Sequence, residues 1–265
     1  MTAADSEFAA VLTGVFHRYP GEVRDSISAI DLTLRSGERV ALIGPSGAGK
    51  STLLSLLDGR LRGFRGGAIV LSNALDARRA PPRNERAKVG FIFQEFALVE
   101  RASVRENVRN GRLGRVTQMA ALFNRFSEAD HSAVDRAMAD AGILEFSEKR
   151  ADCLSGGQRQ RVAIARCLAQ EPQLMLADEP ISNLDPLRAE KILQLLGQTV
   201  GRRNSTLMFS SHQPVLAMRY ADRVIALNNG SIAYDGSPEK LDRVLLAEIY
   251  ANDKGSDCPS LRLVG

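Results

Sequence analysis

One glycine-rich segment constrains this chain more than any other feature, and it reads Gly44-Pro45-Ser46-Gly47-Ala48-Gly49-Lys50-Ser51-Thr52. The short apolar run at 39–43 before it predicts a buried strand, and apolar residues at helical spacing in 53–57 predict a helix after it. A strand, a glycine-rich turn and a helix in this order form the phosphate-binding loop G-x-x-x-x-G-K-[ST]. A turn that contains Lys-Ser by chance would not have these flanking elements.

The residue types of this loop match the chemistry of a nucleotide triphosphate. Glycines allow positive φ angles and a close approach of the backbone. Exposed N–H groups and the helix N-terminus then face the phosphates. We expect Lys50 to reach the β- and γ-phosphates and the Ser51 hydroxyl to ligate Mg²⁺. The predicted cofactors are therefore ATP and Mg²⁺.

Composition places few limits on the partners of this chain. It has 265 residues, of which 44% are apolar and 25% charged, as in ordinary globular proteins. Its net charge of +4 allows a membrane-surface or nucleic-acid partner without requiring one. No apolar run approaches the roughly 20 residues that span a bilayer, and residues 1–7 lack a signal-peptide pattern. We therefore expect a cytoplasmic protein in which Cys153, Cys167 and Cys258 are free thiols.

Strand signals lie on both sides of a long segment that has helical periodicity. We expect strands at 8–19, 26–34, 66–71, 89–93, 174–177, 206–211, 222–227 and 231–234, the last two joined by an Asn228-Asn229-Gly230 hairpin turn. We expect helices at 128–143, 155–171, 187–200 and 238–250, a surface loop at 76–88 and a loosely held tail at 252–265.

The segment 95–170 therefore forms a helical subdomain inserted into the nucleotide-binding core. Four arginines recur there every three or four residues, which predicts one cationic helix face: Arg101, Arg105, Arg109 and Arg112. Such a face is either simply solvated or in contact with a partner or with anionic lipid headgroups.

A second anion-binding helix start follows in Leu154-Ser155-Gly156-Gly157-Gln158. Ser155 is a good N-cap, and the two glycines leave backbone N–H groups accessible. The alternative is a simple capped helix. A single ATP does not need two such cradles from one subunit, whereas two copies facing head to tail could each use one.

Two carboxylates end the predicted strand 174–177 and give the chain its candidate chemistry. Asp178 can hold Mg²⁺, directly or through water, and Glu179 can polarise the attacking water as general base. Two acids at the end of a buried strand are costly unless they serve such roles. Asp185, in the turn at 182–186, could orient the site or cross to a partner copy.

Three single residues have a structural and a functional interpretation. Tyr19 is either an edge-strand aromatic or a ring that stacks on the purine. Gln94 follows the strand 89–93 and either caps a loop or brings an amide to Mg²⁺ and the attacking water. His212 follows the strand 206–211 and is either structural or a sensor of the γ-phosphate.

Together these motifs resemble, in order and approximate spacing, those of ABC-type ATPases from residue 7 to about 240. The resemblance implies an α/β fold: a P-loop NTPase core with an antiparallel β subdomain and an inserted α-helical subdomain. The core and β subdomain would comprise 1–94 and 171–240, the helical subdomain 95–170, and a C-terminal helix and tail 241–265.

The resemblance also implies a nucleotide-sandwich dimer and a set of nucleotide contacts. Ser155 and Gly157 of one copy would close on ATP held by Lys50 of the other. The implied catalytic residues are Glu179, His212, Gln94 and Lys50, and the metal ligands Ser51, Gln94 and Asp178. The implied nucleotide-binding residues are Tyr19, Gly44, Pro45, Ser46, Gly47, Ala48, Gly49, Lys50, Ser51, Thr52, Ser155, Gly156, Gly157, Gln158 and Asp185.

Within that family the chain is most similar to the ATPase subunits of phosphonate importers. The similar stretches are 106–108, 111–114, 122–127, 211–213 and 220–223. This implies membrane-spanning permease subunits, an indirect periplasmic-type substrate-binding protein, and a peripheral position on the cytoplasmic face of the inner membrane. A soluble ATPase attached to a phosphonate-degrading enzyme complex would carry the same motifs. A DNA-repair ATPase is disfavoured because the helical insert lacks sustained heptads, so we expect no nucleic-acid partner.

Overall fold

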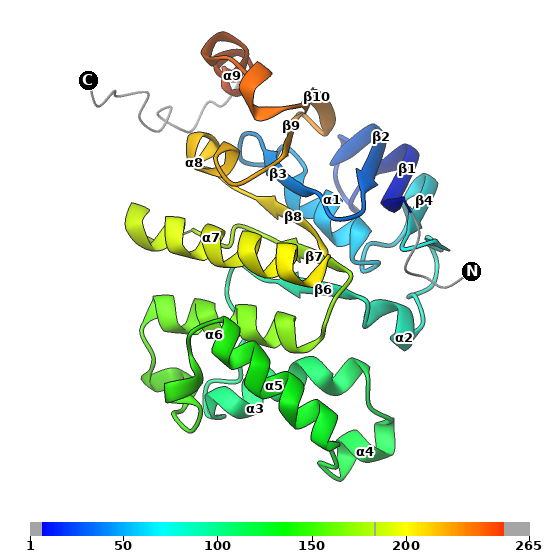
Figure 1. Cartoon of the computed structure of the whole chain (residues 1–265). Coiled ribbons are helices and arrows are strands. Elements are labelled where there is room, and N and C mark those ends of the chain that lie inside the picture. The colour runs from blue at the N-terminus through cyan, green and yellow to red at the C-terminus, as the bar shows by residue number, and fades with distance from the viewer. Residues whose placement is uncertain (1–6, 183, 252–265) are drawn as a thin grey trace.

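This computed structural model describes residues 7–182 and 184–251. The strands in these residues form two sheets (Figure 1). The smaller sheet has the order β2-β1-β4-β5 and is antiparallel throughout. The predicted tail 252–265, with Cys258 in it, lies outside the described residues. The strands of the smaller sheet are β1 (Phe8–His17), β2 (Ile27–Arg35), β4 (Arg65–Val70) and β5 (Asn73–Ala74).

The larger sheet has the order β10-β9-β3-β8-β7-β6, and its strands are parallel except for the hairpin at β10. The predicted turn is confirmed, because Asn229 and Gly230 have φ angles of 48° and 79°. The strands of this sheet are β3 (Arg39–Ile43), β6 (Val89–Ile92), β7 (Leu174–Ala177), β8 (Thr206–Ser210), β9 (Arg223–Asn228) and β10 (Ser231–Gly236).

Helix α1 (Lys50–Leu57) lies between the two sheets, where its leucines pack against both. The central strands are buried on both faces, as expected for parallel strands covered by helices. In β3, Val40 and Leu42 face the core around α1, whereas Ala41 and Ile43 face the core on the other side of the sheet. That second core is covered by α7 (Pro186–Arg203) and also receives residues from the helical segment.

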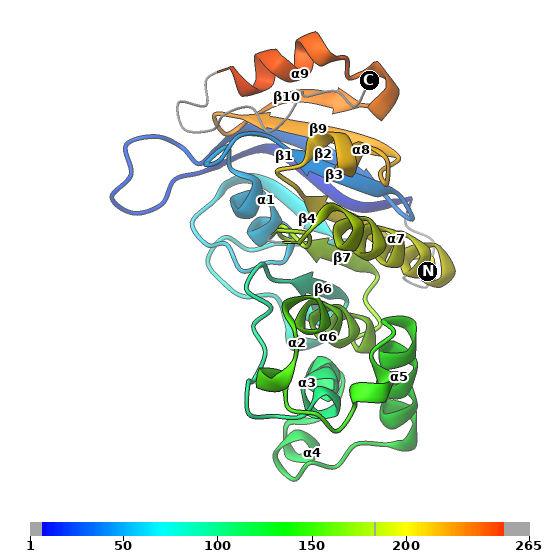
Figure 2. The same cartoon turned by 90° about the vertical axis from the view of Figure 1, so that its left-hand side faces the viewer.

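The helical segment forms its own layered group at the end of the molecule opposite β10 and α9 (Figures 1 and 2). The apolar stripes predicted in 128–143 and in the helix after Ser155 are buried and pack together. Its elements are α3 (Val104–Arg109), the 3₁₀ turn Asn110–Gly114, α4 (Gln118–Leu122), α5 (Glu128–Asp140), the 3₁₀ turns Leu144–Phe146 and Ala151–Cys153, and α6 (Gly156–Ala169).

Several expectations were wrong in detail. The loop expected at 76–88 contains a short helix, α2 (Arg83–Arg86). The helix expected at 238–250 is a 3₁₀ turn, Pro238–Lys240, followed by α9 (Arg243–Tyr250), because Asp242 caps a new helix start. A further short helix, α8 (Pro214–Met218), follows β8.

The single cationic face expected in the helical segment does not exist. Arg112 lies in the 3₁₀ turn after α3 and is buried. Its guanidinium contacts Asp130 and Glu171, each at 2.8 Å. Arg105 pairs instead with Asp135 of α5. The change from α-helix to 3₁₀ turn rotates Arg112 out of register with Arg105, so spacing alone misplaced it.

Candidate nucleotide-binding and active site

The phosphate loop joins β3 to α1 by a path that only glycine can follow at two positions. Gly44 has φ +141°, and a Cβ there would lie 2.1 Å from the carbonyl oxygen of Leu227. Gly49 has φ +102°, and a Cβ there would lie 2.3 Å from the carbonyl oxygen of Ser26. The tight fit presses the loop against the flanking strands, which holds its backbone N–H groups in place.

Lys50 is the first residue of α1, and its side chain folds back over the loop. Its Nζ donates to the carbonyl oxygens of Gly44 at 2.8 Å and of Pro45 at 2.9 Å. The residue is only 5% exposed. A buried ammonium group held by backbone carbonyls is available to exchange these acceptors for phosphate oxygens, which are stronger partners.

A cavity of about 270 Å³ opens above the loop, and Ser26, Ser46, Gly47, Gly49, Lys50, Ser51, Thr52, Glu179 and His212 line it. The structure therefore brings the predicted general base and the predicted phosphate sensor to the phosphate loop, from three separate parts of the chain. His212 Nε2 and the Glu179 carboxylate are in direct contact. Ser26 also lines the cavity and was missed by sequence reasoning, because a serine at the start of the predicted strand 26–34 carries no functional pattern of its own.

Both acids at the end of β7 depend on one hydroxyl from the neighbouring strand. Ser210 Oγ donates to Asp178 Oδ1 at 2.8 Å and accepts from the Glu179 backbone N–H at 2.8 Å. Glu179 has a left-handed φ of +49°, which is uncommon for a residue other than glycine. Ser210 was also missed by sequence reasoning, although its place two residues before His212 at a strand end was a signal.

Tyr19 lies at the edge of the phosphate loop rather than inside the cavity. It follows β1 by two residues, is 40% exposed, and its hydroxyl lies 3.4 Å from Thr52 Oγ1. Its ring packs edge-on against His17, with 4.6 Å between centroids. An exposed ring next to the phosphate loop suits stacking on a base whose phosphates lie in the cavity. The stacking role of Tyr19 stays a prediction.

Three predicted site residues, Asp178, Gln94 and Asp185, are not among the residues that line the cavity. Gln94 is exposed just beyond β6 and is not among the residues that line it. Asp185 is the N-cap of α7 and accepts from the Arg188 N–H at 3.1 Å. Asp185 therefore has a structural role in this chain, and a contact with a partner copy would come in addition to it.

The predicted second cradle forms a cavity of its own. Ser155 and Gln158 make reciprocal capping hydrogen bonds at the start of α6, as predicted for an N-cap. The cavity measures about 250 Å³ and is lined by Ser155, Gly157, Gln158, Arg161, Leu184, Arg188, Lys191 and Ile192. Its cations add to the helix N-terminus as an attraction for anions. This cavity and the phosphate-loop cavity share no lining residue.

The donor set of the phosphate-loop cavity fits Mg²⁺ bound together with a nucleotide. Within the described residues no group of three or more His, Cys, Asp or Glu side chains could hold a metal by itself. Mg²⁺ commonly takes only one or two protein ligands and completes its shell with phosphates and water. The Ser51 hydroxyl lines the cavity, and the Asp178 carboxylate lies just outside its lining, next to Glu179, where Oδ1 accepts a hydrogen bond from Ser210; both are of the right chemistry for that share.

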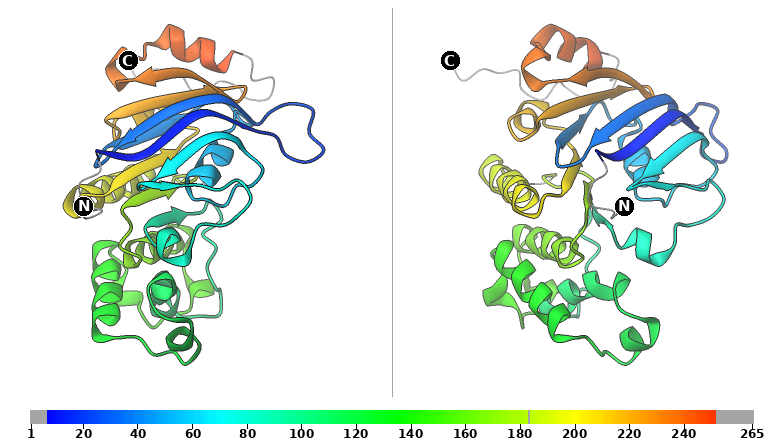
Figure 3. Two further views of the ribbon diagram at one scale, coloured as in Figure 1. Left: turned by 90° about the vertical axis from the view of Figure 1, so that its right-hand side faces the viewer. Right: turned by 45° about the vertical axis from the view of Figure 1, so that its right-hand side comes forward.

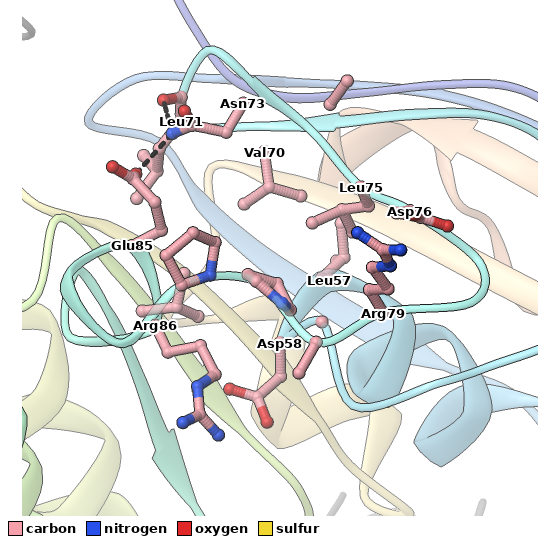
Figure 4. Close-up of a pocket in the computed structure, with 16 residues that line it drawn as sticks. Leu57, Asp58, Val70, Leu71, Asn73, Leu75, Asp76, Arg79, Glu85 and Arg86 are labelled. Atoms are coloured by element: carbon pink, nitrogen blue, oxygen red, sulfur yellow. Dashed lines mark hydrogen bonds between the residues drawn. The ribbon is translucent and has the colours of Figure 1, made fainter.

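A roomier cavity of about 440 Å³ lies between the end of α1, β4, β5 and α2 (Figure 4). None of the predicted site residues line it. Burial raises the pKa of Asp58, one of its lining residues, to about 6 despite the opposing pull of Arg60. In Figure 4, a hydrogen bond from Asn73 to Glu85 crosses one rim of this cavity.

The two cysteines inside the described residues differ in their surroundings. Cys153 is exposed and Cys167 is buried, and both are free thiols, as expected. Burial raises the pKa of Cys167 to about 12, so this thiol stays protonated and unreactive near neutral pH. In the part of the chain that the structure describes, no helix combines the length and apolar character needed to cross a membrane.

Comparisons with known proteins agree with this geometry. A sequence profile described as ABC transporter matches residues 27–182. The chain is 40% identical over 255 residues to the phosphonates import ATP-binding protein PhnC of Thiobacillus denitrificans, covering 96% of this chain and 97% of that protein. It is 43% identical over 227 residues to the protein of the same name from Chromohalobacter salexigens, covering 85% and 83%.

Solved structures give the same answer for the fold. CbiO1 from Clostridium perfringens, part of the ABC transporter complex CbiONQ, superposes with a TM-score of 0.78 at 25% identity, covering 93% of this chain and 96% of that one. A dimeric post-hydrolysis state of the ATP-binding cassette MJ0796, bound to ADP and Pi, gives 0.73 at 28% identity, covering 86% and 98%. The predicted fold class is confirmed.

Proposed function

Because this chain belongs to the ABC transporter family, we propose that it is the ATP-hydrolysing subunit of an importer for phosphonates or related phosphorus compounds. One observation carries the ATPase part: Lys50, Glu179 and His212 converge on a single cavity at the phosphate loop. The proposed cargo is inferred from the names of the relatives. The cargo itself would never touch this chain, so its chemistry is inferred by association alone.

Hydrolysis in this proposal is an in-line attack of water on the γ-phosphate. Glu179 accepts a hydrogen bond from the attacking water and takes its proton as charge develops. His212, in contact with Glu179, faces the γ-phosphate from the same side of the cavity. Lys50 leaves its carbonyl partners to hold the β- and γ-phosphates. Ser51, Asp178 and Gln94 would hold Mg²⁺, which would supply positive charge that offsets the charge of the phosphates.

The active assembly in this proposal is a head-to-tail dimer. Each chain offers one cavity at the phosphate loop and another at Ser155, and these do not share lining residues. In the dimer, Ser155, Gly156, Gly157 and Gln158 of one copy close on the ATP held by the other. The similarity to a dimeric cassette bound to ADP and Pi supports this arrangement. Asp185 borders the second cavity through Arg188 and would lie near the dimer interface.

The dimer would act on two membrane-spanning permease subunits, to which the helical segment 95–170 and Gln94 transmit the ATP state. A periplasmic-type binding protein would deliver the cargo, and this chain would sit peripherally on the cytoplasmic face of the membrane. The functional division into 1–94 with 171–240, 95–170, and 241–265 remains part of the same proposal.

Uptake measurements test this function directly. Cells that carry the wild-type chain should accumulate labelled methylphosphonate, and Lys50→Ala should reduce uptake to background because phosphate binding is lost. Uptake of inorganic phosphate is the matched control and should not change. Affinity purification in detergent should recover a membrane protein with the chain. Unchanged phosphonate uptake together with recovery of soluble phosphonate-degrading enzymes would instead establish the soluble complex.

A further inference from the structure

His17 is the last residue of β1, and its imidazole lies directly under the Tyr19 ring. The two rings meet edge to face, with 4.6 Å between centroids and 88° between planes. Tyr19 is exposed, whereas His17 is only 5% exposed. The backbone keeps this arrangement in register, because the His17 carbonyl accepts from the Ser26 N–H at 2.8 Å. The loop that joins β1 and β2 projects from the body of the molecule just beyond this point (Figure 2 and Figure 3, left).

The buried imidazole has an unusual hydrogen-bond environment. Among the described residues, neither Nδ1 nor Nε2 of His17 has a hydrogen-bond partner. The Gly63 backbone faces the ring, but its geometry falls short of a hydrogen bond. A buried polar group without hydrogen-bond partners costs free energy, so the burial of this imidazole needs an explanation. The contact of its neutral ring with Tyr19 provides one. His17 therefore contributes to this site through the packing of its ring and not through hydrogen bonds.

We propose that His17 is a positioning residue for nucleotide binding: its ring fixes the Tyr19 side chain in the orientation that stacks on adenine. This inference rests on the proposed ATP site. The Tyr19 ring is then held from two sides, by the His17 edge and by the hydroxyl contact with Thr52 of α1 at 3.4 Å. A ring restrained before binding loses less rotational freedom when the base arrives, which strengthens binding.

The charges around His17 define when this support operates. Burial lowers its pKa, and Gly63 and Asp25, which act in the opposite direction, do not overcome that effect. Asp25 is itself engaged by Arg18 at 2.9 Å and lies 4.0 Å from Arg65 of β4. The imidazole is thus neutral above its ordinary value of 6.5, and protonation at lower pH puts a charge on a buried ring, which favours movement of the ring toward solvent and away from Tyr19. The support is present above pH 6.5 and is lost as the pH falls through the lowered pKa.

Affinities for two ligands separate this role from a general effect on the site. ATP and inorganic tripolyphosphate both fill the phosphate loop, but only ATP has a base. For the full-length protein, His17→Ala should weaken ATP binding about 2- to 10-fold, the range of an aromatic pair, and leave tripolyphosphate binding unchanged. His17→Phe, which keeps an aromatic edge, should retain ATP affinity. In a Tyr19→Ala background, His17→Ala should have no further effect.

The pH series gives a second measurement that needs no substitution at His17. The ratio of ATP to tripolyphosphate affinity of the wild type should be constant above pH 6.5 and fall as the pH drops through the lowered pKa of His17, whereas Tyr19→Ala should show a flat ratio. If His17→Ala weakens both ligands equally, or weakens neither while Tyr19→Ala weakens ATP, the positioning role is wrong. If Tyr19→Ala itself leaves ATP affinity unchanged, the predicted adenine contact of the proposed function fails as well.

Discussion

Glu179 has an energetically costly backbone conformation, and it lines the phosphate-loop cavity, where the attacking water would lie. A left-handed φ of +49° costs a residue other than glycine on the order of 1 kcal/mol or more. Its N–H donates a hydrogen bond to Ser210 Oγ, and its carboxylate is in contact with His212. A strained residue that lines the phosphate-loop cavity is better explained by chemistry than by packing, since a glycine would fit the backbone without strain.

Replacement of this single carboxylate should separate ATP binding from hydrolysis. Glu179→Gln keeps the shape of the side chain and removes the base, so hydrolysis should fall about 100- to 10,000-fold. ATP affinity should persist, and size-exclusion chromatography with ATP should show a stable dimer. Glu190→Gln is the matched control and should hydrolyse ATP normally, because it changes a half-buried acid of α7 that pairs with Arg219 and lines neither cavity. Wild-type turnover by Glu179→Gln would contradict the base assignment.

Local patterns predicted some elements well and others poorly. The strand, loop and helix around Lys50, the β9–β10 hairpin and the Ser155 cap were predictable because each is determined within about ten neighbouring residues. Ser210 was not, because its role depends on which strand lies beside β7. Arg112 was misplaced because one 3₁₀ turn changes which way a side chain points, and the contact with Asp130 is made across a separate helix.

The Arg112 cluster should determine the stability of the helical segment. Arg112 joins the 3₁₀ turn after α3 to Asp130 of α5 and to Glu171, and the Arg112 and Asp130 side chains are both 9% exposed. Arg112→Met leaves a buried carboxylate unpaired and should reduce the free energy of unfolding by about 3 kcal/mol. Urea denaturation measures this change. Arg101→Met, at an exposed position nearby, should stay within about 0.5 kcal/mol of wild type.

The same cluster gives a pH dependence with a definite sign. Burial alone would raise the pKa of Asp130, but hydrogen bonds from Ser127 and Arg112 outweigh it and lower the pKa below 3.8. Burial is likewise outweighed by Arg112 at Glu171, whose pKa lies below 4.5. The stabilisation is therefore complete above these ordinary values and is lost as the pH falls through the lowered ones. The difference in urea midpoint between wild type and Arg112→Met should shrink in acid; a constant difference would contradict the ion-pair explanation.

At the scale of the whole molecule, each chain has two cavities with different lining residues, and in the proposed dimer they would bind different nucleotides. The phosphate-loop cavity lies at β3, α1 and the ends of β7 and β8, whereas the second cavity lies between the start of α6 and α7. Association of two copies about a two-fold axis would place the phosphate-loop cavity of each copy against the Ser155 cavity of the other, which gives two equivalent composite sites. Activity should therefore depend on residues supplied by different chains.

Mixing two inactive variants tests this dependence. Lys50→Ala disables the phosphate loop, and Gly157→Asp places a negative charge where the partner's ATP would lie; a Cβ at 157 has room, since its nearest neighbour is 3.9 Å away. Each variant alone should be inactive. An equal mixture should recover up to about a quarter of wild-type ATPase activity, because half of the dimers are mixed and each retains one intact site.

The matched control in this experiment is Gly157→Asn, which has the same shape without the charge and should retain more activity alone than Gly157→Asp. No recovery on mixing, while cross-linking shows that mixed dimers form in the presence of ATP, would show that each chain hydrolyses ATP with its own residues only.

The position of Ser210 has a consequence for control of the motor. One hydroxyl at the end of β8 anchors both acids of β7, and His212 leaves the same strand two residues later. Separation of the end of β8 from β7 would therefore remove the Ser210 hydrogen bonds and displace His212 at the same time, whereas the hydrogen bonds of Lys50 are made within the phosphate loop. Hydrolysis would then stop while ATP remained bound.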